Sequence, residues 1–280
     1  ILRDIYFITS IVSLLFLVIT LFIFCYFRSL HCNRISIHKH LVVSFIIRFI
    51  VTIVMLEPVV FQHIEFSYLA VDLLCKIMRS FEKYTVLTNM YWMLVEGIYL
   101  HNNLVATVFS TEAPFKLFIF IGWIFPAIPT IAWAVAKELT NPSYCWHEYD
   151  NPDIKELNAK LNFILLTPLL IALALNLIFL INIIRVLVTK LRAKNTHESS
   201  RIKKAIRATI ILLPLLGLTN LLFIYNPEDG GSLQMVYHVT NALIQGMQGK
   251  SRIVIFVFNS SYMPSLIGHF DTECAYGALK

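Results

Sequence analysis

The feature that most constrains this chain is its first apolar block, which runs from Ile5 to Phe27 without a charged side chain. An α-helix rises about 1.5 Å per residue and the hydrocarbon core of a bilayer is about 30 Å thick, so about 20 apolar residues cross it. Six further apolar segments follow, at about residues 37–61, 73–101, 116–137, 161–188, 205–225 and 233–258. The sequence therefore predicts an all-α membrane protein with a seven-transmembrane helix bundle.

Composition agrees with this class and excludes others. Of the 280 residues, 58% are hydrophobic and 14% are charged, whereas an average soluble domain has about 25% charged residues. So few charges leave a soluble enzyme of this size without a sufficient polar surface. The net charge of +6 is compatible with nucleic-acid binding, but the basic residues gather in short segments between apolar blocks, as they do in membrane proteins. We expect contacts with membrane lipids and none with nucleic acid.

Loop charges predict the orientation of the bundle. The segment after the first span carries Arg28, Arg34 and Lys39. The segment between spans five and six carries Lys190, Arg192, Lys194, Arg201, Lys203, Lys204 and Arg207. The loops on the other side carry acids, namely Glu65, Asp72, Glu138, Glu148, Asp150, Asp153, Glu156, Glu228 and Asp229. By the positive-inside rule the amino terminus lies outside and the carboxyl terminus inside. Residues 1–260 then form the transmembrane domain and residues 261–280 a cytoplasmic tail.

Charged and amide side chains inside the spans are candidate functional residues, because burying them in a membrane is costly. In span two, His38 lies near the inner end and Arg48 lies deeper. Span three carries Asn89 and, seven residues later on the same helix face, Glu96. Span seven carries an amide stripe of Asn241, Gln245 and Gln248. Two interpretations stay open: a polar network that switches between two packings, and fixed hydrogen bonds between helices.

Span six contains a candidate hinge. Pro214 removes a backbone hydrogen bond and bends the helix, and Gly217 adds local freedom. An ordinary transmembrane kink has the same sequence, so the motif gains weight only beside Thr209 and the basic residues at the inner end of the span.

The cysteines predict one disulfide. Cys75 opens span three at the outer face and Cys145 lies in the outer loop before span five, so both face an oxidising compartment. We expect them to pair, the alternative being two free thiols. None of the five cysteines forms a CxxC pair, so we expect no metal site and no cofactor. The sequence also has no HExxH, GxSxG or paired aspartates, which argues against an enzyme.

Several motifs together resemble one receptor family. They are Phe27-Arg28-Ser29-Leu30, Tyr91-Trp92-Met93, Glu96-Gly97-Ile98-Tyr99-Leu100-His101, Gly122-Trp123 with Pro126, Cys145-Trp146, and Lys204 to Thr209 leading into Leu213-Pro214-Leu215-Leu216-Gly217. The chain resembles the secretin-type (class B) peptide-hormone G protein-coupled receptors over about residues 1–249. Within that family the sequence is most similar to receptors for pigment-dispersing factor, followed by calcitonin-type and diuretic-hormone receptors.

The resemblance implies a multi-pass receptor of the plasma membrane that binds a peptide hormone or neuropeptide. Binding moves the inner half of span six around its kink, a stimulatory heterotrimeric G protein docks, and cyclic AMP rises. It implies roles for four groups of residues. The inner polar lock is His38, Glu96, Thr209 and Phe256; the central polar network is Arg48, Asn89 and Gln248; the activation kink is Pro214 and Gly217; and the G-protein-facing residues are Arg34, Arg185, Lys190 and Arg207.

Two departures from the family pattern bear on whether this sequence binds peptide and signals. The sequence begins directly at span one, so the extracellular hormone-binding domain of the family is absent from it, and we expect these 280 residues to bind peptide poorly. After Gly249 the resemblance fails: Lys250 and Arg252 enter span seven, and Phe256 stands at the position of the lock tyrosine. This break motivates a second hypothesis, a non-signalling truncated variant or decoy. A transporter or channel is a third, which no repeat or broken-helix pattern supports.

Overall fold

The computed structural model describes residues 2–26, 33–61, 68–105, 114–146 and 152–192, and in these ranges it is helical, without strands. The elements are α1 (Leu2–Tyr26), α2 (Asn33–Val60), η2 (Tyr68–Ala70), α3 (Asp72–Val105), α4 (Phe115–Ile119), η3 (Phe120–Ile124), α5 (Ala127–Thr140), η4 (Tyr144–Trp146) and α6 (Pro152–Arg192). The expected spans at 205–225 and 233–258 lie outside the described residues. The first five expected spans are therefore present as helices.

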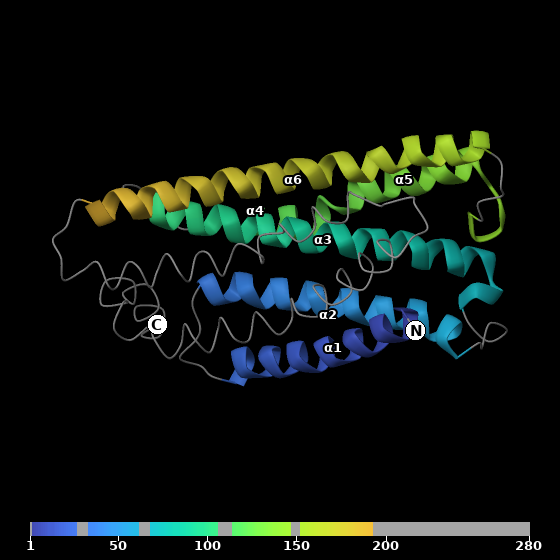
Figure 1. The fold of residues 1–280 in the computed structure, drawn as a ribbon, viewed down its shortest axis with the longest axis horizontal. Helices are drawn as coiled ribbons and strands as arrows, with labels where there is room; N and C mark the ends of the chain where they lie inside the picture. Colours follow the sequence, from blue (N-terminus) through green and yellow to red (C-terminus); the bar gives the residue numbers. More distant parts are fainter. Residues whose placement is uncertain (1, 27–32, 62–67, 106–113, 147–151, 193–280) are drawn as a thin grey trace.

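The long helices lie side by side with their axes close to one direction (Figure 1). α3 is central: it packs against α2 on one side and against η3, α5 and α6 on the other. α1 packs against α2, and α5 packs against α6. The start of α3 and the turn that contains Cys145 lie at the same end of the bundle, which we call the disulfide end. The opposite end carries His38 and Glu96.

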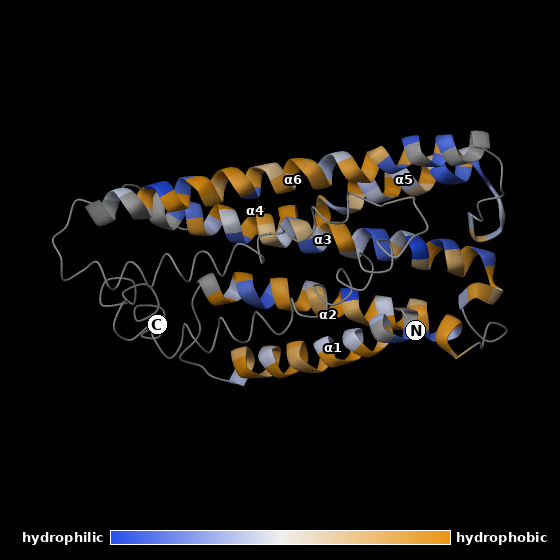
Figure 2. Ribbon diagram, viewed as in Figure 1, coloured by the Kyte–Doolittle hydropathy of each residue, from blue (hydrophilic) through white to orange (hydrophobic). Residues whose placement is uncertain are grey.

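The described helices expose apolar side chains that a soluble protein would bury. Phe22 of α1, Ile131 of α5 and Phe163 of α6 are each at least 60% exposed, and apolar colouring runs along the outer helices (Figure 2). Large exposed apolar patches indicate contact with a partner or a membrane. Four described segments are long and apolar enough to cross a bilayer: Tyr6–Tyr26, Ile35–Val60, Phe115–Thr140 and Glu156–Val186.

Hydroxyl groups inside these apolar helices are satisfied locally. The Ser10 hydroxyl donates to the Tyr6 carbonyl at 2.7 Å, and the Thr20 hydroxyl donates to the Phe16 carbonyl at 2.8 Å. Bonds of this kind reach back one turn and compete weakly with the helix ladder. In lipid they matter because no water is present to accept the hydrogen bond. Polar residues in α1 therefore do not argue against a membrane span.

The expected fourth span is not one continuous helix. α4 and α5 are joined by the π-helical segment η3, in which the Phe125 amide donates to the Phe120 carbonyl at 2.9 Å, five residues back. Pro126 has no amide hydrogen, so the regular α-helical ladder is interrupted at this point. Gly122 is buried inside η3 against Trp92 of α3. A π turn of this kind often marks a functional site and cannot be read from apolar periodicity.

Two other spans extend further than expected. α2 starts at Asn33, so Arg34 and Lys39 belong to a helix rather than to the preceding loop. α6 runs for 41 residues, from Pro152 to Arg192, against an expected 161–188. At about 1.5 Å per residue it is about 60 Å long, roughly twice the hydrocarbon thickness. Its ends therefore extend beyond the apolar layer, which explains why apolar runs alone underestimate it.

Candidate functional site

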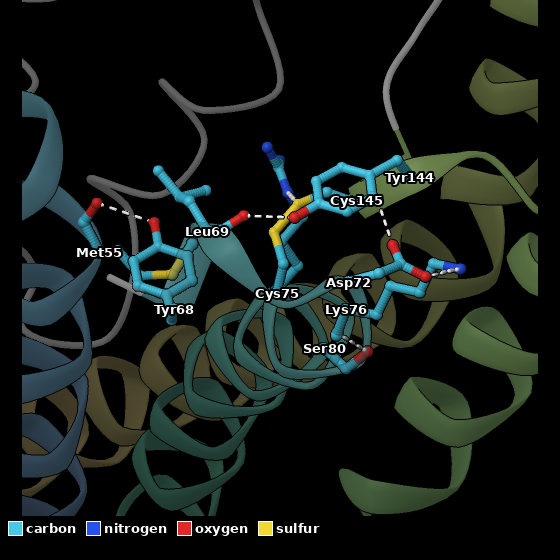
Figure 3. Close-up of a disulfide and its surroundings, with 10 residues drawn as sticks. Met55, Tyr68, Leu69, Asp72, Cys75, Lys76, Ser80, Tyr144 and Cys145 are labelled. Carbon is cyan, nitrogen blue, oxygen red and sulfur yellow. Dashed lines mark hydrogen bonds and ion pairs between the residues drawn. A yellow bond between two sulfur atoms is a disulfide. The ribbon is translucent and has the colours of Figure 1, made fainter. Parts of the chain in front are cut away.

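The disulfide end is built around the first turn of α3. The structure joins Cys75 to Cys145, with their Cα atoms 5.5 Å apart, and so confirms the expected pairing (Figure 3). The bond closes a loop with a sequence separation of 70 residues. It therefore attaches the turn after α5 to the start of α3.

The turn that presents Cys145 has an unusual backbone. Cys145 and Trp146 both have positive φ angles, 51° and 52°, and they are the described non-glycine residues with this conformation. A left-handed residue costs roughly 1–2 kcal/mol for a side chain with a Cβ. Such strain persists only where surrounding contacts hold it, and it gathers at functional sites. The contacts that hold these two residues are all at the disulfide end.

Asp72 caps this arrangement from α3. Its Oδ1 accepts a hydrogen bond from the Cys145 amide at 2.5 Å, and its Oδ2 lies 2.9 Å from the Lys76 ammonium one turn later. The hydrogen bond from the Cys145 amide, followed by that from Lys76, lowers the pKa of the Asp72 carboxyl below its ordinary value. The carboxylate thus binds the Cys145 amide and the Lys76 ammonium at the same time.

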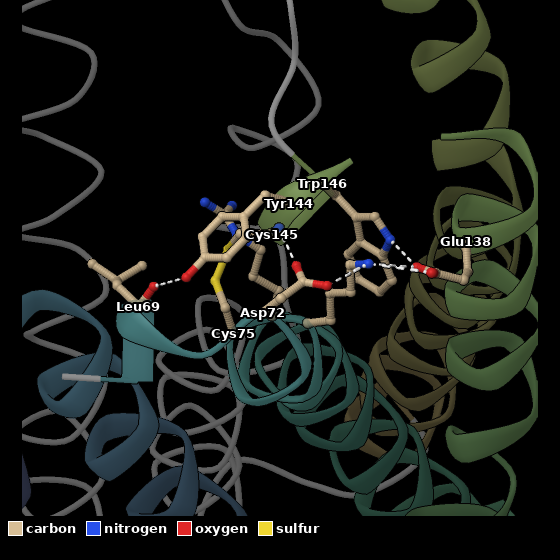
Figure 4. Close-up of polar contacts among 9 residues, drawn as sticks. Leu69, Asp72, Cys75, Glu138, Tyr144, Cys145 and Trp146 are labelled. Carbon is tan, nitrogen blue, oxygen red and sulfur yellow. Dashed lines mark hydrogen bonds and ion pairs between the residues drawn. A yellow bond between two sulfur atoms is a disulfide. The ribbon is translucent and has the colours of Figure 1, made fainter. Parts of the chain in front are cut away.

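Lys76 continues the network to α5. Its ammonium lies 3.0 Å from Glu138 Oε2, and the same oxygen accepts a hydrogen bond from the Trp146 indole nitrogen at 2.8 Å (Figure 4). The Trp146 ring packs edge-on against Trp133, with centroids 5.4 Å apart. One buried lysine therefore connects two carboxylates on two helices, and one of those carboxylates orients the indole of the turn.

Two tyrosine hydrogen bonds attach η2, the segment before α3, to its neighbours at the disulfide end. The Tyr144 hydroxyl donates to the Leu69 carbonyl at 2.7 Å, and the Tyr68 hydroxyl donates to the Met55 carbonyl of α2 at 3.0 Å. The turn of Cys145 is consequently held by a disulfide, an aromatic contact and four hydrogen bonds, with Leu69, Asp72, Glu138 and Arg79. Among the described residues no group of His, Cys, Asp and Glu is arranged to hold a metal ion.

The opposite end brings together two residues that the sequence singled out. His38 Nδ1 of α2 lies 3.3 Å from Glu96 Oε1 of α3. The Glu96 side chain is buried and that of His38 is partly exposed. The other two residues assigned to the inner polar lock, Thr209 and Phe256, lie outside the described residues. The structure therefore brings His38 and Glu96 together, and their role as a lock stays a prediction.

The middle of α3 carries a buried amide. Asn89 is 1% exposed, and neither of its amide atoms has a hydrogen-bond partner within the described residues. Arg48 of α2 lies half-buried, and its carbonyl accepts a hydrogen bond from Thr52. Gln248, the third residue of the expected central network, lies outside the described ranges. Asn89 is thus a buried polar residue in the middle of α3, and the central polar network stays a prediction.

The remaining predicted residues are only partly placed. Arg185 is exposed near the end of α6. Arg34 and Lys190 lie in α2 and α6, and the structure describes their backbone alone. Arg207, Pro214 and Gly217 lie outside the described residues. The G-protein-facing surface and the activation kink therefore stay predictions.

Sequence reasoning missed three features of α3. The first is Lys76, whose spacing of four from Asp72 is a signal for an ion pair on one helix face. The second is the charged run that continues through Arg79, Glu82 and Lys83. The third is the Trp92 ring, which stacks on His40 with centroids 4.8 Å apart and planes 6° apart. No local pattern in the sequence predicts that contact, because it joins α2 to α3.

A sequence model of the family described as 7 transmembrane receptor (Secretin family) matches residues 1–251. The chain belongs to the secretin family of seven-transmembrane receptors. This confirms the resemblance that its motifs indicate. The match also ends close to Gly249, after which those motifs stop.

Individual relatives support the same family assignment. Corticotropin-releasing factor receptor 2 of Rattus norvegicus is 38% identical over 248 residues, which cover 88% of this chain and 57% of that receptor. Calcitonin gene-related peptide type 1 receptor of Xenopus laevis is 37% identical over 259 residues, covering 91% and 52%. Secretin receptor of Rattus norvegicus is 34% identical over 238 residues, covering 84% and 51%. The chain thus spans a little over half the length of these relatives, and its similarity to pigment-dispersing-factor receptors stays a prediction.

Proposed function

We propose that this chain is the transmembrane core of a peptide-hormone or neuropeptide receptor of the plasma membrane. In this proposal the disulfide end faces outward and receives the peptide. The opposite end faces a stimulatory heterotrimeric G protein, whose activation raises cyclic AMP. The observation that carries the proposal is the family match over residues 1–251, since relatives in that family are named as receptors for peptides.

The switch in this proposal is the inner polar lock. The contact of 3.3 Å between His38 and Glu96 ties α2 to α3. Thr209 and Phe256 complete the lock from spans six and seven, and its release lets span six bend at Pro214. A ligand shifts such an equilibrium only by its difference in affinity for the two states. Phenylalanine has no hydroxyl group, so the lock loses one hydrogen bond relative to a tyrosine at position 256.

The central network connects the two ends. In the proposal Arg48, Asn89 and Gln248 lie below the bound peptide and respond to its depth of insertion. Unpartnered amide atoms in a buried site cost free energy until a partner arrives. The state of Asn89 within the described residues supports this role, because its amide has two donors and one acceptor to offer. At the other end, Arg34, Arg185, Lys190 and Arg207 supply positive charge for the G protein.

The test is a cyclic AMP assay in cells. The chain is joined behind the extracellular domain of a pigment-dispersing-factor receptor, and surface staining measures delivery to the plasma membrane. Pigment-dispersing factor, a calcitonin-type peptide and corticotropin-releasing factor are added separately. A rise with one peptide supports the proposal and selects the branch. Normal surface staining without a rise to any of them contradicts it.

The non-signalling alternative has less support. It rests on Lys250 and Arg252, yet the family match includes the first of them. Long basic side chains near a helix end extend their charge towards the interface, so their presence alone does not break a span. In the assay above, a decoy would also lower the surface level of a co-expressed full-length receptor, which a signalling receptor has no reason to do.

A further inference from the structure

The outer half of α3 carries a charged face that lies beside the disulfide and outside the network of Asp72, Lys76 and Glu138. Cys75, Arg79, Glu82, Lys83 and Val86 follow the spacing of three and four that places residues on one side of a helix. The side is fixed by a contact: Arg79 Nε donates to Cys145 Sγ at 3.3 Å. This face, which we call the α3 charged face, therefore lies under the disulfide.

The α3 charged face does not pack against span four. The opposite side of the helix does so, because the Tyr84 hydroxyl donates to the Trp123 carbonyl at 2.9 Å. Five turns further along α3, on the same side as Arg79, Gly97 packs against Asn176 and Phe179 of α6. Within the described residues, the side of α3 that turns to α6 is thus covered near the opposite end, whereas near the disulfide end Arg79 is exposed and the Lys83 side chain is 42% exposed.

Exposed charges at this depth of a membrane helix need an explanation. A charge that faces lipid costs at least about 2.5 kcal/mol on insertion scales, so such residues face water, protein or a ligand. Tyr68 marks one border of the face. Burial raises the pKa of its hydroxyl, the positive charge of Arg79 lowers it, and the negative charge of Glu82 raises it. The charges of the face and the loop before α3 therefore share one polar region.

The α3 charged face carries a local net charge of +1, because it has Arg79 and Lys83 against Glu82. Lys76 is matched by two carboxylates, so it contributes no free positive charge. Arg79 and Lys83 have only Glu82 within the face, and the Lys83 ammonium lies 3.9 Å from it. Adjacent residues on a helix do not face one another, so this contact is weak. One turn below Val86 lies the buried amide of Asn89, whose atoms lack a partner among the described residues.

We propose that Arg79 and Lys83 form a subsite for a carboxylate side chain near the inserted end of the peptide ligand, with the Asn89 amide below it. This inference rests on the proposed function, because it assigns ligand chemistry to the same outward-facing site. Arginine binds carboxylates with two parallel hydrogen bonds, and a lysine beside it adds a mobile point charge. The Cys145 contact uses one guanidinium nitrogen and leaves the two terminal nitrogens to bind an anion.

The first arm of the test measures the potential at the face and needs no ligand. In the full chain on intact cells, Val86→Cys places a thiol between the charges and Asn89. Its rates of reaction are measured with two membrane-impermeant methanethiosulfonates, the anionic ethylsulfonate and the cationic ethyltrimethylammonium. Leu139→Cys, an exposed position at the disulfide end of α5, is the reference thiol and reports surface delivery. We expect the anionic-to-cationic rate ratio to be about tenfold higher at position 86.

Charge variants decide whether Arg79 and Lys83 cause that ratio. Arg79→Gln with Lys83→Gln should remove the tenfold preference at position 86. Lys160→Gln is the matched control, because Lys160 is an exposed lysine paired with Glu156 at the same end of α6. It should leave the ratio unchanged. Equal ratios at positions 86 and 139, or a ratio that survives loss of both charges, would overturn the proposal.

The second arm separates a peptide carboxylate from a free anion. Variants of pigment-dispersing factor carry Glu, Gln or Lys at each of the first five positions in turn, and cyclic AMP potency is measured. At one position we expect Glu to exceed Lys by at least about tenfold, and Lys83→Glu to reverse that order. The same order in both receptors would overturn the peptide subsite. If no variant raises cyclic AMP in any receptor, the proposed function fails, while the labelling result still decides the anion preference of the face.

Discussion

Replacing Gly122 by alanine tests how η3 packs on α3. A Cβ at this position would lie 2.7 Å from both Cζ2 and Nε1 of Trp92. Carbon atoms prefer about 3.5–4.0 Å, so the ring must move by about 1 Å. It has no free direction in which to move, because Trp92 is 0% exposed and stacks on His40 on its other side. Trp123 also contacts it edge-on at 5.8 Å.

The expected change in the free energy of unfolding follows from two opposing effects. Overpacking of a filled core costs about 1–3 kcal/mol, and a rigid ring between two neighbours belongs at the upper end, about 3 kcal/mol. Alanine recovers about 1 kcal/mol of helix propensity relative to glycine. The net loss is about 2 kcal/mol. For a chain of this size that corresponds to a fall of about 4–8 °C in the thermal midpoint.

The assay is thermal unfolding of the detergent-solubilised chain, followed by fluorescence-detected size exclusion. Trp92→Phe provides the control, because the smaller ring leaves room for the added methyl group. In that background Gly122→Ala should cost little, so the double-mutant cycle gives a coupling of about 2 kcal/mol. A more stable Gly122→Ala chain, or an equal loss in both backgrounds, would refute the packing argument.

Three further predictions concern the two ends of α3. Lys76→Gln leaves two carboxylates facing each other, so the thermal midpoint should fall by several degrees, and Glu138→Gln in that background should restore part of the loss. Because the pKa of folded Asp72 lies below its ordinary value of 3.8, its contribution is complete above that pH and disappears as the pH falls through the folded pKa; Asp72→Asn should remove this acid sensitivity from the melting curve. Glu96→Gln weakens the contact with His38, so basal cyclic AMP should rise several-fold in the fused receptor at equal surface level; unchanged basal signalling would count against the lock.

Features that depend on one segment alone could be predicted from the sequence, whereas contacts between segments that are distant in the sequence could not. The apolar run that ends at Phe27 and the outer positions of Cys75 and Cys145 predict a span and a disulfide, because bilayer thickness and redox compartment act on each segment separately. The close packing at Gly122 involves a tryptophan in another helix. The same is true of Lys76, whose second carboxylate comes from α5, at a sequence distance of 62 residues.

α3 shows why hydropathy and membrane location are separate properties. It is absent from the described segments apolar enough to cross a bilayer alone, because five charges lie between Asp72 and Lys83 and the remainder carries polar residues such as Asn89, Glu96 and His101. Yet it occupies the centre of the described bundle and contacts α2, α5 and α6. A central helix contacts neighbouring helices rather than lipid. Its charged side chains can therefore be tolerated where those neighbours provide partners. Within the described residues Lys76 and Glu96 each contact an oppositely charged or basic partner, whereas Arg79 and Lys83 share one acidic neighbour, Glu82. Charges of this kind face water, other protein groups or a ligand, and the proposed subsite assigns them a ligand carboxylate.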